Sequence, residues 1–247
     1  MRLTERILLI GSGEADWAPT DPLDSQVYLV ETPGGHVLVD AGAGASVPAM
    51  VEAARHDGVD PDRVAWVLLT HGHADHAGGA AAWRRALPNV RIAAAPEVAG
   101  WLAAGDETGT SVDRARRAGI YPSTYHLEAC EPDRELVAET PFVVGDLTFQ
   151  VVPTPGHAVG HLSFLTVIDG VRTLFSGDAL FPQGRILLQD TWDCDLHDAL
   201  RSVERLAALL PDRLLAGHLG PVLRDAQPHL DAAMARIARM LLPDSLS

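Results

Sequence analysis

The sequence contains no lysine at all, because every one of its 19 basic residues is an arginine. This absence excludes enzymes that form a lysine Schiff base, phosphate-binding loops that require a lysine, and a lysine general base. Cysteine is nearly absent too, and Cys130 and Cys194 form no Cys-x-x-Cys pair. Two isolated cysteines exclude a disulfide framework and favour a reduced protein inside the cell.

Positive charge is also scarce in this chain. The formal net charge is −14 at pH 7, which argues against the basic face of a nucleic-acid-binding protein and disfavours docking to an anionic membrane. No apolar run approaches the roughly 20 residues of a membrane span. The run Ile7–Ile10 is too short for a secretory signal. We therefore expect a cytoplasmic protein without a nucleic-acid or membrane partner.

The composition is otherwise that of a folded globular protein, with 47% hydrophobic and 21% charged residues in 247. Apolar and alternating runs predict strands at 6–10, 26–31, 36–40, 64–70, 91–94, 147–152, 162–168, 171–175 and 213–216. Helical spacing predicts helices at 46–56, 77–87, 97–104, 195–210 and 228–242. Ser46 and Asp195 are the expected N-caps of two of these helices. The interspersed pattern predicts a single α/β domain of packed layers over residues 1–247.

Local signals predict two hairpins and one insertion. Thr32–Gly35 and Asp169–Gly170 each separate two strand-like runs and are typical of hairpin turns. Regular spacing of apolar residues is absent from about 105 to 139, a segment that is long for a loop in a compact domain. We expect this segment to be an insertion beside the active site.

The densest group of chemistry-bearing side chains is Thr70-His71-Gly72-His73-Ala74-Asp75-His76. Three histidines and one aspartate directly follow the apolar run 64–70. A strand that passes through a short loop into a helix projects several such side chains into one small volume. Imidazole and carboxylate groups are the ligands that suit zinc and similar metals. The group therefore predicts a metal site.

Three more ligand-type residues, His157, Asp178 and His218, each follow an apolar strand and a glycine. Glycine lets the backbone turn tightly and approach a metal closely. One histidine after a strand is usually structural. Three such positions together with the first group favour one shared metal centre.

In these residues the chain resembles the metallo-β-lactamase fold superfamily, whose signature is His-x-His-x-Asp-His. The resemblance covers nearly the whole chain and implies a four-layer αββα sandwich with a dinuclear site at one edge. It implies two Zn²⁺ ions per chain, with iron or manganese as alternatives. The implied ligands are His71, His73 and His157 for the first ion, Asp75, His76 and His218 for the second, and Asp178 as the bridge.

The resemblance also assigns roles to single residues. A hydroxide held between the two metals would attack the carbonyl of an ester, thioester or lactone of a small metabolite. Asp75 would orient this nucleophile and handle its proton, which makes Asp75 the expected catalytic residue. Asp40 and His161 are expected to hydrogen-bond metal ligands from behind.

Aromatic residues make up only 5% of the chain, and several of them fall in the irregular segments beside the predicted site. Aromatic side chains at such a place suit an apolar or acyl-bearing small molecule. The predicted substrate contacts are Trp17, Tyr121, Tyr125, Phe181 and Trp192.

Other activities on the same fold stay open at this point. One alternative is a mononuclear iron oxidoreductase similar to persulfide dioxygenases, and others are a β-lactamase, a phosphodiesterase or an inert binding module. Asp178 and the absence of lysine weigh against a true lactamase. A chain that ends in one helix without lysine departs from the glutathione-binding region of glyoxalase II. The oligomeric state is open, with a homodimer as one option.

Overall fold

A computed structural model of the chain describes residues 1–13 and 20–246. The chain divides into two compact units. Unit 1 comprises Met1–Val137 with Val144–Asp146, and unit 2 comprises Ala138–Val143 with Leu147–Ser247. Each unit has its own sheet and its own helices, and the single domain expected over 1–247 stays a prediction.

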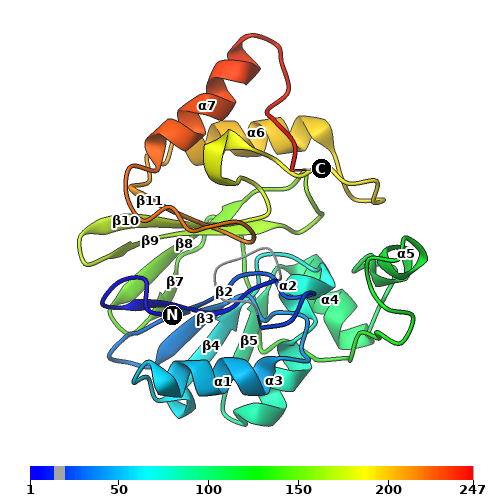
Figure 1. The fold of residues 1–247 in the computed structure, drawn as a ribbon, viewed down its shortest axis with the longest axis vertical. Coiled ribbons are helices and arrows are strands. Elements are labelled where there is room, and N and C mark those ends of the chain that lie inside the picture. Colours follow the sequence, from blue (N-terminus) through cyan, green and yellow to red (C-terminus); the bar gives the residue numbers. More distant parts are fainter. Residues whose placement is uncertain (14–19, 247) are drawn as a thin grey trace. The chain divides into compact units, whose positions relative to one another are not determined.

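Unit 1 is built on a six-stranded sheet in the order β1-β2-β3-β4-β5-β6. The first three strands pair antiparallel, and β3 to β6 pair parallel. Helices α1 and α3 lie on one face of this sheet (Figure 1). The strands are Ile7–Gly11, Val27–Val30, His36–Val39, Val64–Leu68, Arg91–Ala94 and Arg134–Glu135. The helices are α1 Val47–His56, α2 Ala74–Ala77, α3 Ala80–Ala86, α4 Pro96–Ala104 and α5 Val112–Arg117, with a 3₁₀ turn, η1, at Pro61–Arg63.

Unit 2 is built on a five-stranded sheet in the order β11-β10-β9-β8-β7. Helices α6 and α7 pack on this sheet through a buried cluster that includes Leu174, Val203 and Leu230 (Figure 1). The strands are β7 Phe142–Val144, β8 Leu147–Pro153, β9 Leu162–Ile168, β10 Val171–Gly177 and β11 Arg213–Ala216. The helices are α6 Leu196–Ala207 and α7 Gln227–Ala238, with a 3₁₀ turn, η2, at Pro182–Gly184.

Both predicted hairpins are confirmed. Thr32–Gly35 joins β2 to β3, and Asp169–Gly170 joins β9 to β10 in antiparallel pairs. The latter two residues have φ of +53° and +78°, the values that a tight two-residue turn requires. The continuous apolar run of β4 is explained by its place between β3 and β5, where parallel strands are buried on both faces.

One local prediction is confirmed and two need correction. Asp195 caps α6 as expected, because its side chain accepts the Asp198 N–H. Ser46 makes no cap bond at α1, and its hydroxyl donates instead to the buried carboxylate of Asp24. The helix expected over 77–87 is two helices, α2 and α3, that are separated at Gly78 and Gly79.

No helix in the part of the chain that the structure describes is long and apolar enough to cross a membrane.

Candidate metal centre

The first group of predicted ligands lies at the end of β4 and along α2 in unit 1. The rings of His71 and His73 have their centroids 4.8 Å apart, and those of His71 and His76 are 4.1 Å apart. The ligand atoms of Asp75 and His76 lie within 4.8 Å of each other, as do those of His71 and His73. All three histidines are buried, while the Asp75 side chain is 20% exposed. The loop therefore brings all four predicted ligands of this group together.

Asp40 holds two of these histidines in place. Its Oδ2 lies 2.8 Å from Nδ1 of His76. The hydroxyl of Thr70 donates to the same carboxylate at 2.9 Å and lies 3.0 Å from Nδ1 of His71, so it accepts from that ring. A histidine whose Nδ1 bonds to the protein presents Nε2 to a metal. One buried carboxylate thus orients both rings.

Close packing of backbone fixes α2 against the loop that carries Asp40. The Ala41 N–H donates to the carbonyl of His76 at 2.7 Å, and the Gly79 N–H donates to that of Gly42 at 2.7 Å. A Cβ at Gly79 would lie 2.1 Å from the Ala41 carbonyl oxygen. Only glycine permits this approach.

The insertion contacts this group through two tyrosines that the sequence predicts as substrate contacts. Tyr121 is buried, and its Oη lies 3.1 Å from Oδ1 and 3.2 Å from the backbone N of Asp75. Tyr125 is half-buried and donates to the carbonyl of Ala43 at 3.0 Å. Burial, followed by the charge of Asp75, raises the pKa of both phenols above their usual value. Both hydroxyls therefore stay protonated, and the Tyr121 hydroxyl binds Asp75, whereas the Tyr125 hydroxyl binds the loop that follows Asp40.

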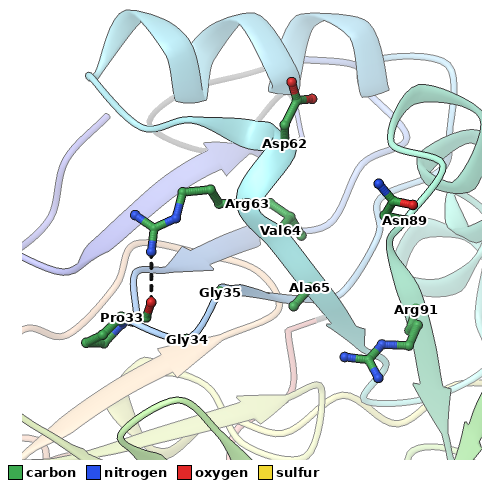
Figure 2. Close-up of a pocket in the computed structure, with 9 residues that line it drawn as sticks. All are labelled: Pro33, Gly34, Gly35, Asp62, Arg63, Val64, Ala65, Asn89 and Arg91. Carbon is green, nitrogen blue, oxygen red and sulfur yellow. Dashed lines mark hydrogen bonds between the residues drawn. The ribbon is translucent and has the colours of Figure 1, made fainter.

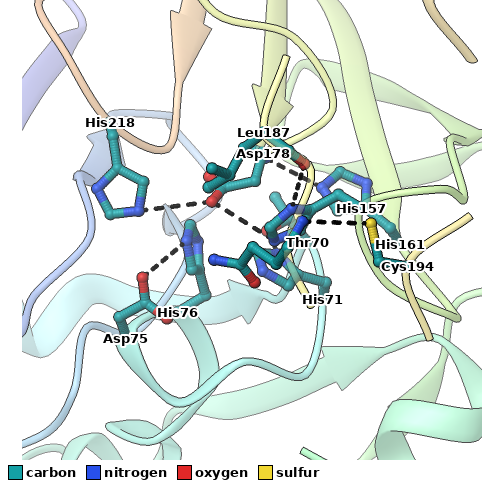
Figure 3. Close-up of polar contacts among 12 residues, drawn as sticks. Thr70, His71, Asp75, His76, His157, His161, Asp178, Leu187, Cys194 and His218 are labelled. Atoms are coloured by element: carbon teal, nitrogen blue, oxygen red, sulfur yellow. Dashed lines mark hydrogen bonds and ion pairs between the residues drawn. The ribbon is translucent and has the colours of Figure 1, made fainter. Parts of the chain in front are cut away.

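The second group of predicted ligands lies in unit 2 and centres on Asp178, which directly follows β10. Its Oδ2 is 3.6 Å from Nε2 of His157 and 3.5 Å from Nε2 of His218 (Figure 3). Asp178 is only 3% exposed. Nδ1 of His157 bonds to the carbonyl of Leu187 at 3.1 Å, which turns Nε2 of that ring toward Asp178. The three residues that the sequence places after separate strands are thus neighbours.

His161 supports Asp178 from behind. Its Nε2 accepts the backbone N–H of Asp178 at 3.1 Å, and its Nδ1 lies 2.8 Å from the hydroxyl of Thr154. Thr154 in turn lies 2.9 Å from the hydroxyl of Ser163. Because both ring nitrogens face protein partners, the arrangement suits the expected supporting role better than direct ligation.

Gly156 anchors the loop that carries His157 against the start of α6. Its φ is +125°, and a Cβ there would lie 2.1 Å from the backbone N of Ala199. The Asp195 N–H donates to the Gly156 carbonyl at 2.8 Å. The glycine before His157 therefore serves close packing and an unusual backbone angle.

The other predicted substrate contacts differ from one another. Phe181 is fully buried, and its ring stacks on that of His218 at a centroid distance of 6.3 Å. Phe181 therefore packs against His218, which is one of the predicted ligands. Trp192 is 56% exposed, which leaves it accessible to a ligand. Trp17 lies outside the described residues.

A pocket of about 480 Å³ in unit 1 contains none of the predicted ligands. Its Arg63 donates to the carbonyl of Pro33 at 3.0 Å, and Arg91 lies over the ring of Trp66 at 4.1 Å. Figure 2 shows the two guanidinium groups directed to different ends of the pocket. They do not converge on one ligand. The lining residues are Pro33, Gly34, Gly35, Asp62, Arg63, Val64, Ala65, Asn89 and Arg91.

The donor chemistry of both groups suits a transition metal such as zinc. Each group offers imidazole nitrogens and carboxylate oxygens only, which are the ligand types of zinc, iron and manganese sites. The hydrogen bonds to His71, His76 and His157 set the ring orientations, as metal-binding histidines require. The residues present therefore fit a metal.

Comparison with known proteins identifies the family. A family model described as the metallo-beta-lactamase superfamily matches residues 20–218. The chain belongs to this superfamily. The predicted α/β fold class is thereby confirmed, and the motif at residues 71–76 lies inside the matched region.

Individual relatives of this superfamily member add detail. The uncharacterized protein YobT of Bacillus subtilis is 29% identical over 225 residues, which cover 85% of this chain and 88% of YobT. A hydroxyacylglutathione hydrolase of Anaeromyxobacter dehalogenans is 32% identical over 161 residues, which cover 65% of this chain and 48% of that protein. The match thus spans about half the length of that hydrolase. The occurrence of hydrolases among the relatives supports an enzyme.

A solved structure shows the same fold. The crystal structure of BJP-1, a subclass B3 metallo-beta-lactamase of Bradyrhizobium japonicum, matches with a TM-score of 0.73 at 20% identity. The match covers 97% of this chain and 91% of that one. At this identity the likeness concerns the fold alone.

Proposed function

We propose that the chain is a zinc-dependent hydrolase that cleaves an ester, thioester or lactone bond of a small metabolite. The observation that carries the proposal is the pair of ligand groups, each held by hydrogen bonds from behind, in a member of the metallo-beta-lactamase superfamily. Asp40 orients the ring of His76, and His161 accepts the backbone N–H of Asp178.

The proposal divides seven ligands between two ions. His71, His73 and His157 would hold one ion, and Asp75, His76 and His218 would hold the other, with Asp178 as the shared ligand. When bound, such ions make water a strong nucleophile near neutral pH and polarise the oxygen of the bond under attack. The remaining work is done by the side chains of the chain itself.

Asp75 is the proposed catalytic residue. Its carboxylate is 20% exposed, whereas Asp178 is 3% exposed. Asp75 can therefore be reached by water and handle a proton, and its Oδ1 accepts the Tyr121 hydroxyl. Asp178 is too enclosed for such an exchange and serves as a ligand.

The acyl character of the substrate is supported by the relatives named hydroxyacylglutathione hydrolases, since such a substrate is a thioester. The likeness to BJP-1 supports no β-lactam substrate, because it concerns the fold alone. An acyl thioester or a lactone is therefore the first class to test.

The test begins with the metal content of the purified chain and of two variants. We expect up to two equivalents of zinc in the wild type and a clear loss in His71→Ala. The control is His56→Ala, which removes an exposed histidine at the end of α1. A wild type that binds less than about one equivalent, with His71→Ala unchanged, would contradict a metal centre.

The second stage is a panel of acyl thioesters, lactones, phosphodiesters and a chromogenic lactam. It is run with zinc-loaded and iron-loaded protein. We expect hydrolysis of a thioester or lactone by the zinc form, with loss of turnover in Asp75→Asn. Oxygen uptake by the iron form without hydrolysis would instead support the oxidoreductase alternative.

A further inference from the structure

We propose that Tyr121 is a positioning residue for Asp75. By binding one carboxylate oxygen, Tyr121 determines which oxygen Asp75 presents to a metal. The inference rests on the proposed metal-dependent function. It assigns to the insertion a part in the metal centre rather than in substrate binding.

The contact between the two residues has two points. The Tyr121 hydroxyl accepts the backbone N–H of Asp75 at 3.2 Å and donates to its Oδ1 at 3.1 Å. A single hydroxyl thus binds the start of α2 and one side-chain oxygen of the same residue. Two bonds to one residue fix both the backbone position and the rotation of the carboxylate.

The other carboxylate oxygen faces a neighbouring predicted ligand. Oδ2 of Asp75 lies 3.3 Å from Nε2 of His76 (Figure 3). Nδ1 of that histidine bonds to Asp40. With Oδ1 taken by Tyr121, Asp75 and His76 present Oδ2 and Nε2 side by side. Tyr121 binds Oδ1 of Asp75, and Asp40 binds Nδ1 of His76. Each of them therefore occupies the atom that the proposed ligand does not present to a metal.

The tyrosine itself is well fixed. Tyr121 is 7% exposed, and the Tyr125 ring lies 5.0 Å from it at an interplanar angle of 33°. Tyr125 is anchored in turn by its bond to Ala43, in the loop that follows Asp40. A Cβ at Gly78 would lie 2.1 Å from the Tyr125 hydroxyl, so this ring packs tightly against the end of α2. A fixed ring can hold the rotation of a carboxylate.

The test is Tyr121→Phe, which keeps the ring and removes only the hydroxyl. Metal affinity is measured by zinc titration against a competing chelator, and the ligand field is measured by the absorption spectrum of the cobalt-substituted protein. We expect affinity for one of the two ions to fall by about 10–100-fold, as typically follows loss of a group that orients a ligand. We also expect an altered cobalt spectrum and a lower kcat with KM nearly unchanged.

Two other tyrosines provide controls. Tyr28→Phe removes a hydroxyl in β2 that bonds to Gln26, and its metal affinity should equal that of the wild type. Tyr125→Phe removes the hydroxyl of the adjacent ring, which bonds to backbone rather than to Asp75. Its loss of metal affinity should be much smaller than that of Tyr121→Phe, which separates the Asp75 contact from general packing of the insertion.

The outcomes distinguish this inference from the proposed function. Wild-type zinc affinity and cobalt spectrum in Tyr121→Phe would overturn the inference, whatever the activity. An equal loss in Tyr125→Phe would overturn it as well, because packing would then be the cause. A wild type that binds two ions but hydrolyses no substrate of the panel would overturn the proposed function alone. A wild type that binds no metal would overturn both.

Discussion

At Asp40, one buried carboxylate accepts hydrogen bonds that orient two histidines, His76 directly and His71 through Thr70. The residue has a φ of +64°, in the left-handed region that asparagine and aspartate tolerate best among residues other than glycine. Asp40→Asn therefore keeps the backbone preference and changes only the side-chain chemistry.

The expected result of Asp40→Asn is a loss of metal affinity of about 10–100-fold. The carboxamide can still accept the Thr70 N–H through its oxygen, but its amino group then meets the Nδ1–H of His76, donor against donor. We also expect the metal-free protein to lose about 1–3 kcal/mol of unfolding free energy, because a buried donor lacks its acceptor. Chelator competition and urea unfolding measure the two effects.

The control for Asp40→Asn is Asp146→Asn, which removes an exposed carboxylate paired with Arg6. An exposed ion pair contributes about 0–1 kcal/mol, so metal affinity there should not change. Equal losses of affinity in both variants would show that Asp40 has no particular role at the metal centre.

The residues of the site differ in how well their roles can be predicted from the sequence. The sequence predicts His71, His73, Asp75 and His76 because four residues of ligand type lie in one short segment. The roles of Thr70 and Tyr121 could not be predicted. Thr70 is an ordinary residue at the end of an apolar run, and Tyr121 lies 46 positions from the carboxylate that it binds. Their roles depend on tertiary contacts, which local spacing does not contain.

The contact between α2 and the Asp40 loop gives a prediction for whole elements. Gly79→Ala places a Cβ 2.1 Å from a backbone oxygen that cannot move cheaply. We expect a loss of about 1–3 kcal/mol in unfolding free energy, the usual range for overpacking, together with weaker metal binding. Thermal unfolding and chelator competition measure both.

The matched control is Gly100→Ala in α4, where a new Cβ would meet nothing within 4 Å. Because glycine is unfavourable inside a helix, this variant should gain about 0.5–1 kcal/mol. If Gly79→Ala also raised the unfolding free energy, close packing would not be what requires glycine at position 79.

An ion pair within the insertion joins Arg116 to Glu107. Both side chains are less than one quarter exposed. Glu107 also accepts from His126 and from the Leu127 N–H. The hydrogen bond from Arg116, together with these donors, holds the Glu107 pKa below its usual value of 4.5. A lowered carboxyl pKa stabilises the folded state above the ordinary value, and this contribution is lost as pH falls through the folded value.

We therefore predict that protection from amide exchange across residues 107–130, corrected for the intrinsic exchange rate at each pH, falls below about pH 4.5 in the wild type. In Glu107→Gln this protection should be lower than in the wild type already at pH 7, because the opening free energy falls by about 1–2 kcal/mol. That change corresponds to exchange roughly tenfold faster. Hydrogen-exchange mass spectrometry measures it. Glu128→Gln, which breaks an exposed pair with Arg85, should have no such effect.

Among the elements, the sequence patterns identified the long strands and helices well. Strands β4, β9 and β10 are continuous or alternating apolar runs, and α6 has a clear apolar stripe. The patterns missed α5 and β6, both in the insertion. Val112–Arg117 is mostly exposed and charged, and Arg134–Glu135 is a two-residue edge strand. Short exposed elements have little apolar periodicity, so tertiary contacts decide them.

At the scale of the whole molecule, the proposed ligand set is shared between the two units. Unit 1 supplies His71, His73, Asp75 and His76, and unit 2 supplies His157, Asp178 and His218. If the ligands act as one centre, metal binding is linked to the folded state of the complete chain. Ligand binding to the folded state alone adds stability that grows with the free ligand concentration.

The last prediction tests this linkage. At free zinc 100-fold above its dissociation constant, the complete chain should gain about 2.7 kcal/mol over its chelator-treated form. For a protein of this size that is a rise in Tm of roughly 5–10 °C. His71→Ala in unit 1 and Asp178→Ala in unit 2 should each remove most of this rise, whereas His56→Ala should keep it. A full zinc-dependent rise in either variant would show that the substituted residue is not a ligand of the metal.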